Sequence, residues 1–516
     1  MERCVLLINK THIALKQLGF KYRLKFNHWL LLMILMLAII PASAQMPIKY
    51  RMVEQVPPDT ADLNYYGKKN FLRAGGEVIG LNTALWAFDR FVLHGDYSYI
   101  SFKTIKENFK HGFVWDNDQL GTNTFMHPYN GSFYYSAGRS NGFNFWQSGM
   151  FAIGGSALWE LCMENEYPSI NDVIATPIGG AVLGETLFRA SDALIDDRTH
   201  GADRFGRELA AFIISPMRGI NRLITGQAWK HRATSGRLFG TPNIAFQVSA
   251  GVEVMTFQGR MRSPYPGGVV QLDLEYGDRF EAKSKKPYDY FTVRAKLQGM
   301  KYQPVLAQLN IKGRLLSREV LDHKNSSGSI GLYQHFDYYD SDTITNIDKV
   351  PYKLGVPASL GVGFLFRDVQ RRRYIFDCYA HANAVILGSI LSDHYMTDKR
   401  NYNFASGFSL KGGANIVWGK KRSSISVSHE YYRLFTWKGY APGTDLSAVD
   451  FHTLNVMGDK SVASFNITEV RFDYQLYKKL YGTLTFVNRA RSTHYRDWPD
   501  KRSSTMSLSA MLTYKF

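Results

Sequence analysis

The last twelve residues of the chain, 505–516, read TMSLSAMLTYKF. Every second side chain from Met506 to Phe516 is apolar, and the positions between them hold mainly small or polar residues. Because successive side chains of a β-strand point to opposite faces, this alternation predicts a strand with one apolar face and one polar face. The chain ends on an aromatic residue directly after this strand.

The same alternation recurs upstream, and we count about twelve such segments between residues 243 and 516. An even number of long strands is typical of membrane barrels. A soluble β-sandwich would bury the apolar faces, whereas a membrane barrel turns them toward lipid, and alternation alone does not separate these architectures. The clearest segments begin at the apolar residues Ile244, Val270, Phe291, Leu309, Leu360, Phe376 and Phe404.

The first 44 residues have the order of a cleavable export signal. Basic residues, Lys21 among them, precede the apolar run WLLLMILMLAII at 29–40, and the small residues Ala42 and Ala44 follow it. The run is short for a membrane anchor. The predicted export signal and the last strand together favour a membrane barrel over a secreted sandwich. A last strand that ends at Phe516 resembles the signal that the outer-membrane assembly machinery recognises. We therefore expect that machinery as a partner and the cell outer membrane as the location.

The full sequence carries a formal charge of +18. The first 44 residues hold six Lys or Arg and one acidic residue, so the rest of the chain keeps +13. We exclude nucleic acid as a partner, because no basic helix or nucleic-acid motif occurs. Anionic outer-membrane lipids explain the charge better. Only Cys162 and Cys378 follow the predicted signal, which excludes a disulfide scaffold and predicts two free thiols. No cofactor and no oligomeric state are indicated.

The polar faces of the early predicted strands carry opposite charges. Glu253, Asp273 and Glu275 fall on the first two strands, and Arg294 and Lys296 fall on the next. If these strands are neighbours, an acidic stripe faces a basic one inside the barrel. We favour charge compensation in a wet or plugged lumen, since barrel interiors are commonly polar, and a polar conduit or binding site is the alternative.

The region before the strands has helical rather than alternating patterning. The sequence predicts an extended leader at 45–70, a helical module at 71–240 and a C-terminal antiparallel transmembrane β-barrel of about twelve strands at 241–516. The fold class is therefore an α+β membrane protein. Within the helical module we expect helices at 75–93, 173–197 and 204–226, the last interrupted near Pro216, and an irregular aromatic-rich segment at 94–140.

The segment 140–159 has no charged residue, which is a feature of transmembrane helices. It contains several glycines and the amides Asn141, Asn144 and Gln147, whose polar groups need partners. We therefore expect a helix buried within the protein. Gly180 and Gly184, spaced one turn apart, predict a close helix–helix contact.

The most unusual residues lie between 123 and 222. The run HPYNGSFYYSAGRSNG, from 127, and the run WELCMENEYPSINDVIATPIGGAVLGE, from 159, resemble the family catalogued as domain of unknown function 3943, which comprises exported proteins of Gram-negative bacteria. The resemblance covers roughly 75–226, and it implies an outer-membrane setting but no activity. Family members often have Ala-Arg where this chain has Gly138-Arg139, which leaves the arginine in place. The motif residues that we single out for binding are Tyr134, Arg139, Trp159, Glu166, Ser169, Glu185, Asn221 and Arg222.

Four residues of this block are candidates for catalysis, although the sequence does not single out a metal site. Glu160 and Glu164 would share one helical face if the helix continues, and with His127 they could perform acid–base chemistry or hold a divalent metal. Asp172 completes this set. We expect His127, which precedes a proline, to be a loop residue.

Two further pairs have simpler interpretations. Ser169 followed three residues later by Asp172 predicts a helix N-cap rather than a nucleophile. Glu185 and Arg189 predict an i, i+4 ion pair. None of the motifs G-x-S-x-G, H-E-x-x-H or a P-loop occurs in a supporting context.

Three functions remain open. The favoured one is a non-enzymatic barrel whose helical module plugs or caps it and handles lipid or an envelope partner, with Glu160, Glu164 and Arg139 in a satisfied network. The second is an outer-membrane enzyme acting on lipid or glycan through the His127 and carboxylate set. The third is a channel or transporter lined by the charged strand faces. The sequence does not decide whether the protein is an enzyme.

Overall fold

The computed structural model describes residues 68–116, 118–257, 265–280, 286–342, 350–370, 374–397, 400–419, 423–449 and 456–516. The predicted export signal at 1–44 and nearly all of the predicted leader at 45–70 lie outside the described residues.

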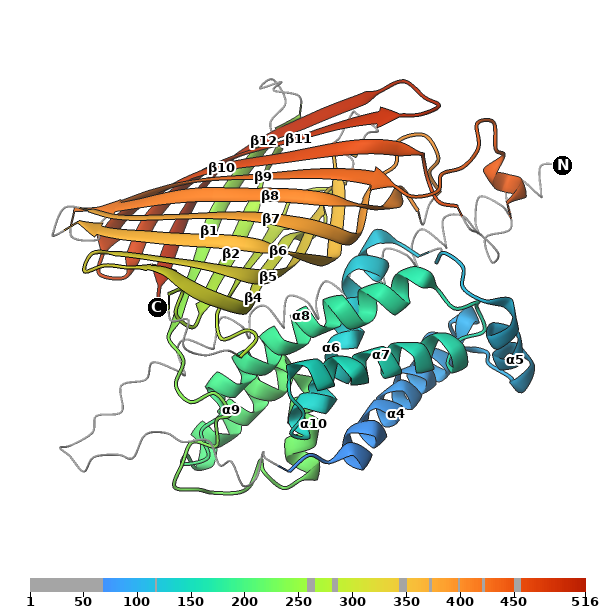
Figure 1. Ribbon diagram of the computed structural model, residues 1–516, viewed down its shortest axis with the longest axis horizontal. Coiled ribbons are helices and arrows are strands. Elements are labelled where there is room, and N and C mark those ends of the chain that lie inside the picture. Colours follow the sequence, from blue (N-terminus) through green and yellow to red (C-terminus); the bar gives the residue numbers. More distant parts are fainter. Residues whose placement is uncertain are drawn as a thin grey trace.

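Twelve antiparallel strands form a closed barrel, as the sequence predicts (Figure 1). Each strand pairs with its chain neighbours, and β1 pairs with β12 to close the ring. The strands are β1 Ile244–Phe257, β2 Tyr265–Tyr276, β3 Phe291–Gly299, β4 Leu306–Asp322, β5 Ser326–Asp340, β6 Lys353–Gln370, β7 Tyr374–Leu391, β8 Tyr402–Trp418, β9 Ser423–Thr436, β10 Ser461–Tyr477, β11 Leu480–Tyr495 and β12 Lys501–Lys515.

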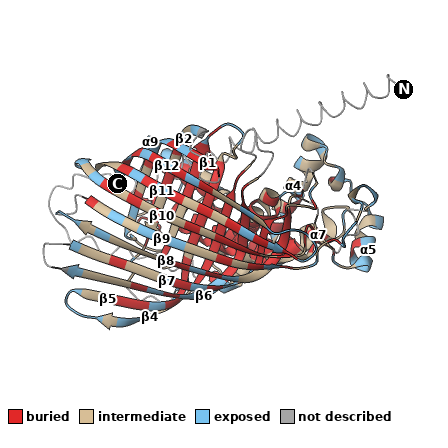
Figure 2. Cartoon of the chain, turned by 90° about the horizontal axis from the view of Figure 1, so that it is seen from above, coloured by how far each residue is buried: buried red, intermediate tan, exposed pale blue. Residues whose placement is uncertain are grey.

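The last strand shows which face of the barrel is apolar. Leu508 and Leu512 are 58% and 56% exposed on its outer side, whereas Ser509 and Thr513 are buried on the inner side. The alternation of buried and exposed residues is visible across the neighbouring strands in Figure 2. Apolar side chains therefore point outward and polar side chains point inward, which is the reverse of a soluble barrel.

Charged side chains from distant strands meet inside the barrel. Arg294 on β3 lies 2.8 Å from Glu469 on β10, five strands away in the barrel order. Lys411 on β8 lies 2.5 Å from Asp337 on β5. Lys296 pairs with Glu253, so the predicted compensation between the acidic and basic stripes is confirmed. Side chains thus span the lumen at the levels of these pairs.

The helical module contains more helix than the sequence predicts. Part of the segment 94–140, which we expected to be irregular, is helical, because α5 is started by a capping box between Ser101 and Thr104 and α6 has Pro128 in its first turn. Residues 112–116, 118 and 119 form no helix, as expected. The helices are α4 Phe71–Phe88, α5 Phe102–His111, α6 His127–Ser140, α7 Phe145–Cys162, α8 Ile170–Leu194, α9 Gly201–Ile214 and α10 Pro216–Ile224, with short turns η1 Asp89–Leu93, η2 Asp96–Ser98, η3 Thr122–Met126 and η4 Leu446–Ala448.

No helix in the described part of the chain has the length and apolar character of a membrane span. Helices α6 and α8 approach each other closely at Gly180 and Gly184, which confirms the predicted helix–helix contact. A Cβ at Gly180 would lie 2.6 Å from the backbone carbon of Gly131, and one at Gly184 would lie 2.6 Å from the Tyr135 ring. The glycines therefore set the spacing of the central helix pair.

The helical module packs on the outer face of the barrel wall, with α8 nearest the barrel and α4 on the far side (Figure 1). The strand register shows that the helices cover the outer face of the barrel. Tyr514 is 43% exposed on β12, and the residues registered beside it on successive strands share its outer face but are buried where the helices cover them. This row is Tyr514, Val248, Leu272, Ala295, Leu309 and Tyr338.

Polar contacts fasten this interface. Gln334 on β5 donates a hydrogen bond to the carbonyl oxygen of Ile178 in α8, and Asn123 donates to the Tyr402 hydroxyl at 2.7 Å. Between α6, α8 and strands β1–β4 lies an apolar cavity of about 50 Å³. The described helices therefore flank the outer wall of the barrel, and neither form of the prediction, a plug in the lumen or a cap on the barrel, describes their position. The alternating pattern could not show this, because an outward apolar face serves equally well against lipid or a helix.

Candidate functional site

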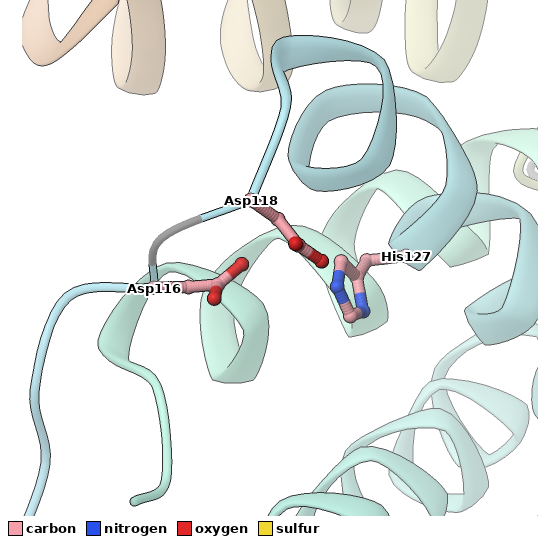
Figure 3. A group of neighbouring side chains, drawn as sticks. All are labelled: Asp116, Asp118 and His127. Carbon is pink, nitrogen blue, oxygen red and sulfur yellow. The ribbon is translucent and has the colours of Figure 1, made fainter. Parts of the chain in front are cut away.

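One end of the helical module gathers the catalytic candidates. His127 begins α6, Glu160 lies near the end of α7, and Asp172 lies in the first turn of α8. Ligand atoms of these three residues lie within 4.8 Å of one another. The loop before α6 adds Asp116 and Asp118, which lie similarly close to His127 (Figure 3). We call Asp116, Asp118, His127, Glu160, Glu164 and Asp172 the His127 cluster.

His127 lies in a helix rather than in the expected loop. Its Nε2 is 3.6 Å from Oδ1 of Asp172, and its side chain is only 16% exposed. The contact is slightly longer than a hydrogen bond. Both groups are thus positioned for proton exchange or for binding a shared ligand.

Ser169 organises the carboxylates, in agreement with the predicted N-cap. Its hydroxyl accepts a hydrogen bond from the backbone N–H of Asp172 and donates one to Oδ2 of the same residue. Its own backbone N–H donates to Oε2 of Glu160 at 2.7 Å. The hydroxyl is fully engaged in capping, and a nucleophilic role has no geometric support.

Glu164 lies in the cluster for a reason other than the predicted helical spacing. Helix α7 ends at Cys162, so Glu160 and Glu164 do not share a helical face. Instead, the Glu164 side chain accepts a hydrogen bond from Trp159 Nε1 at 3.2 Å and contacts the Glu160 carboxyl group. Glu166 is exposed.

The electrostatics of this cluster are unbalanced. Burial, reinforced by the neighbouring carboxylates, raises the pKa of Asp116, Glu160 and Glu164 well above the usual range. Within the described ranges, no Lys or Arg forms an ion pair with these three residues. Groups of this kind can keep a proton at neutral pH and act as general acids, with a neighbouring ionised group as base.

Arg139 and Glu185 lie in a second, separate cluster. Arg139 Nε lies 2.7 Å from Glu185 Oε2, Arg189 Nε lies 2.8 Å from Oε1, and the Tyr135 hydroxyl donates to Oε2. We call these four residues the Glu185 cluster. Burial alone would raise the pKa of Glu185, but the two guanidinium groups hold it below its usual value. The predicted ion pair between Glu185 and Arg189 is confirmed, and Arg139 completes a buried triad with them.

The remaining motif residues bind structural partners. The Tyr134 hydroxyl donates to Asn82, and Asn221 donates to Glu77 Oε1 at 2.7 Å. The Arg222 guanidinium lies 2.8 Å from Asp197 and 2.8 Å from Glu208, in an arginine-rich network at the end of the module opposite the His127 cluster. None of these residues joins His127.

Sequence reasoning missed Asp116 and Asp118. Both lie in the segment that we expected to be irregular, and their signal is an Asp-x-Asp pair nine residues before His127. Backbone hydrogen bonds from Val114 to Pro168 and from Ile170 to Val114 hold this loop against the start of α8. The spacing alone does not predict that pairing.

Fold and site together define a closed antiparallel barrel with a helical module on its outer wall and a His/carboxylate cluster at one end of that module. Residues 112–217 match the family model described as domain of unknown function (DUF3943), which confirms the resemblance over a shorter range than we predicted. This match contains the whole His127 cluster, the Glu185 cluster and all of α6–α9.

Solved structures of outer-membrane barrels are similar to this chain at low identity. The NanC porin is 7% identical over 51% of this chain and 98% of its own, with a TM-score of 0.23. The toluene transporter TodX from Pseudomonas putida is 6% identical over 53% and 89%, with a TM-score of 0.21. The outer membrane channel DcaP of Acinetobacter baumannii is 8% identical over 53% and 97%, with a TM-score of 0.19. No curated protein matches, and similarity this distant carries no functional argument.

Proposed function

We propose that this is an outer-membrane protein of Gram-negative bacteria whose barrel anchors a lipid-embedded helical module that acts on, or holds, membrane lipid. One observation carries the proposal. Large apolar side chains are exposed on the outer face of the barrel and also on the outward faces of the helices that flank it, and we call these two sets of side chains the apolar belt.

The outward faces of α4 and α7 are the helical part of this belt. Trp146 and Met150 on α7 are 63% and 64% exposed, and Ile79 and Phe88 on α4 are also exposed. No charged residue occurs between Phe145 and Trp159. Exposed apolar patches on water-soluble proteins are usually small, and larger ones mark a contact with lipid or a partner.

Charged residues border the belt near the His127 cluster. Helix α5 exposes Lys103, Lys106 and Lys110 together with Phe102 and Phe109. Asn108 of the same helix donates a hydrogen bond to the carbonyl oxygen of Glu164, which places α5 at the cluster. An amphipathic helix with lysines on its polar face suits the headgroup region of an anionic membrane.

The lumen favours an anchor over an open channel. Ion pairs such as Arg294–Glu469 cross it, and the aromatic rings of Tyr352 and Phe465 meet inside it with their centroids 5.3 Å apart. A conducting path would have to separate these side chains. We expect purified protein in planar bilayers to show no steady open-pore conductance, and a stable conductance would revive the channel alternative.

Spin labelling tests the lipid belt. With the native cysteines replaced by Ser, a label at Ile153→Cys on α7 should be more accessible to oxygen than to a water-soluble nickel complex in reconstituted liposomes. Leu512→Cys on the barrel is the lipid-facing control, and Lys106→Cys on α5 is the polar control. A label at position 153 that behaves like the one at 106 would place the helical module in water and overturn this part of the proposal.

Catalysis on lipid is the more specific form of the proposed function, and it rests on the 3.6 Å contact between His127 and Asp172. His127 would exchange a proton with the substrate, with Glu160 or Glu164 as the protonated partner. The lipid composition of envelopes should change in a deletion strain, be restored by the wild-type gene and by the exposed control His323→Ala, and not be restored by His127→Ala. Full restoration by His127→Ala would exclude this enzyme and leave a lipid-holding role.

A further inference from the structure

Three side chains of the His127 cluster, those of Asp116, Asp118 and His127, have the composition of a metal site. Asp116 and Asp118 extend from the loop before α6 toward the ring of His127 (Figure 3). One ligand atom from each lies within 4.8 Å of the others. Two carboxylates and an imidazole at this spacing can converge on one cation.

A second observation points to a ligand at this place. Oδ2 of Asp116 is inaccessible to solvent and receives no hydrogen bond from the described residues. The backbone N–H of Asp116 is held by Oδ1 of Asn171 at 3.1 Å, so the residue is fixed in position. A buried carboxylate oxygen without a donor is costly unless a cation neutralises it.

The surroundings also favour a cation. Glu160 and Asp172 lie behind His127, with ligand atoms within 4.8 Å of it and of each other. In the described part of the chain neither carboxylate pairs with Lys or Arg. Carboxylates that contact a ligating histidine fix its orientation and raise its basicity toward a metal.

We propose that Asp116, Asp118 and His127 bind one divalent transition-metal cation of the Mn²⁺ or Zn²⁺ class, with Asp172 positioning the His127 ring. The imidazole nitrogen favours these ions over Ca²⁺ and Mg²⁺, which prefer all-oxygen sites. This site goes beyond the proposed lipid-holding role, which needs no metal, and it gives His127 the role of a metal ligand in place of proton exchange with a substrate.

The test uses the full chain purified in detergent micelles and stripped of metal with EDTA. Titration with Mn²⁺, followed by the loss of the free-ion EPR signal, should show one saturable site. Asp116→Asn, Asp118→Asn and His127→Ala should each weaken the affinity by at least about tenfold. Glu107→Gln, on the exposed side of α5, removes a nearby carboxylate outside the site and should bind as the wild type does.

A thermal measurement separates loss of the site from loss of the fold. Mn²⁺ should raise the unfolding temperature of the wild type and of Glu107→Gln, because a ligand that binds only the folded state stabilises it. Asp116→Asn should keep a folded apo protein, since it removes a carboxylate oxygen that has no donor, and should show no Mn²⁺-dependent rise. Absent saturable binding in the wild type, or wild-type affinity in folded Asp116→Asn and His127→Ala, would overturn the site without bearing on the lipid proposal.

Discussion

Two of the buried acidic residues of helix α8 have opposite electrostatic surroundings. Glu185, in its second half, is bracketed by the guanidinium groups of Arg139 and Arg189. Asp172, in its first turn, faces His127 as its only basic neighbour among the described residues, and it shares its surroundings with Glu160. Both carboxyl groups are almost inaccessible to solvent.

The difference separates a structural network from a candidate functional site. In the Glu185 cluster two fixed cations compensate a fixed anion, so the three side chains join α6 to α8. In the His127 cluster the acids repel one another, and Ser169 and Trp159 give them hydrogen bonds but no fixed positive charge. An arrangement that is unfavourable for folding is expected where a perturbed acid or a bound cation is required.

The largest effect is expected from Glu185→Gln. The substitution leaves Arg139 and Arg189 buried without their counter-ion, and breaking a buried ion pair from one side costs about 3–5 kcal/mol. We expect a loss of this size in the free energy of unfolding, measured by guanidinium titration in detergent with tryptophan fluorescence as the signal. Glu107→Gln is the matched exposed control. A loss below about 1 kcal/mol would show that the Glu185 cluster is not a stabilising network.

A smaller loss is expected from Gly180→Ala, which tests the helix pair that carries both clusters. The added methyl group would lie 2.6 Å from the backbone of Gly131, so α6 and α8 must separate at a cost of about 1–3 kcal/mol. Gly154→Ala is the control, because no atom lies within 4 Å of its added Cβ. That variant should gain about 0.5–1 kcal/mol from helix propensity. Equal effects of the two variants in the same unfolding titration would contradict the close contact.

Sequence periodicity predicted the barrel well, because the two-residue alternation within a strand such as 505–516 does not depend on the length of the loops between strands. It could not place the helical module, since the outward faces of β2–β5 have the same pattern whether lipid or α8 covers them. The Ser169 cap and the Glu185–Arg189 pair are local and were predicted. The His127 cluster joins a loop to three helix ends, and such long-range contacts leave no periodic signal.

The smallest effect, and the one that sharpens the comparison most, is expected from Glu160→Gln. Its amide oxygen can still accept the hydrogen bond from the backbone of Ser169, while the carboxylate that repels Asp172 and Glu164 is removed. In the presence of EDTA we expect the free energy of unfolding to be unchanged or to rise by up to about 1 kcal/mol, since Gln replaces a carboxyl group whose ionised form is disfavoured by burial and by the neighbouring carboxylates. The sign is opposite to that for Glu185→Gln, in the same helical module and by the same measurement. A loss above about 2 kcal/mol would mean that Glu160 supports the fold as Glu185 does, and the distinction between the two clusters would fail.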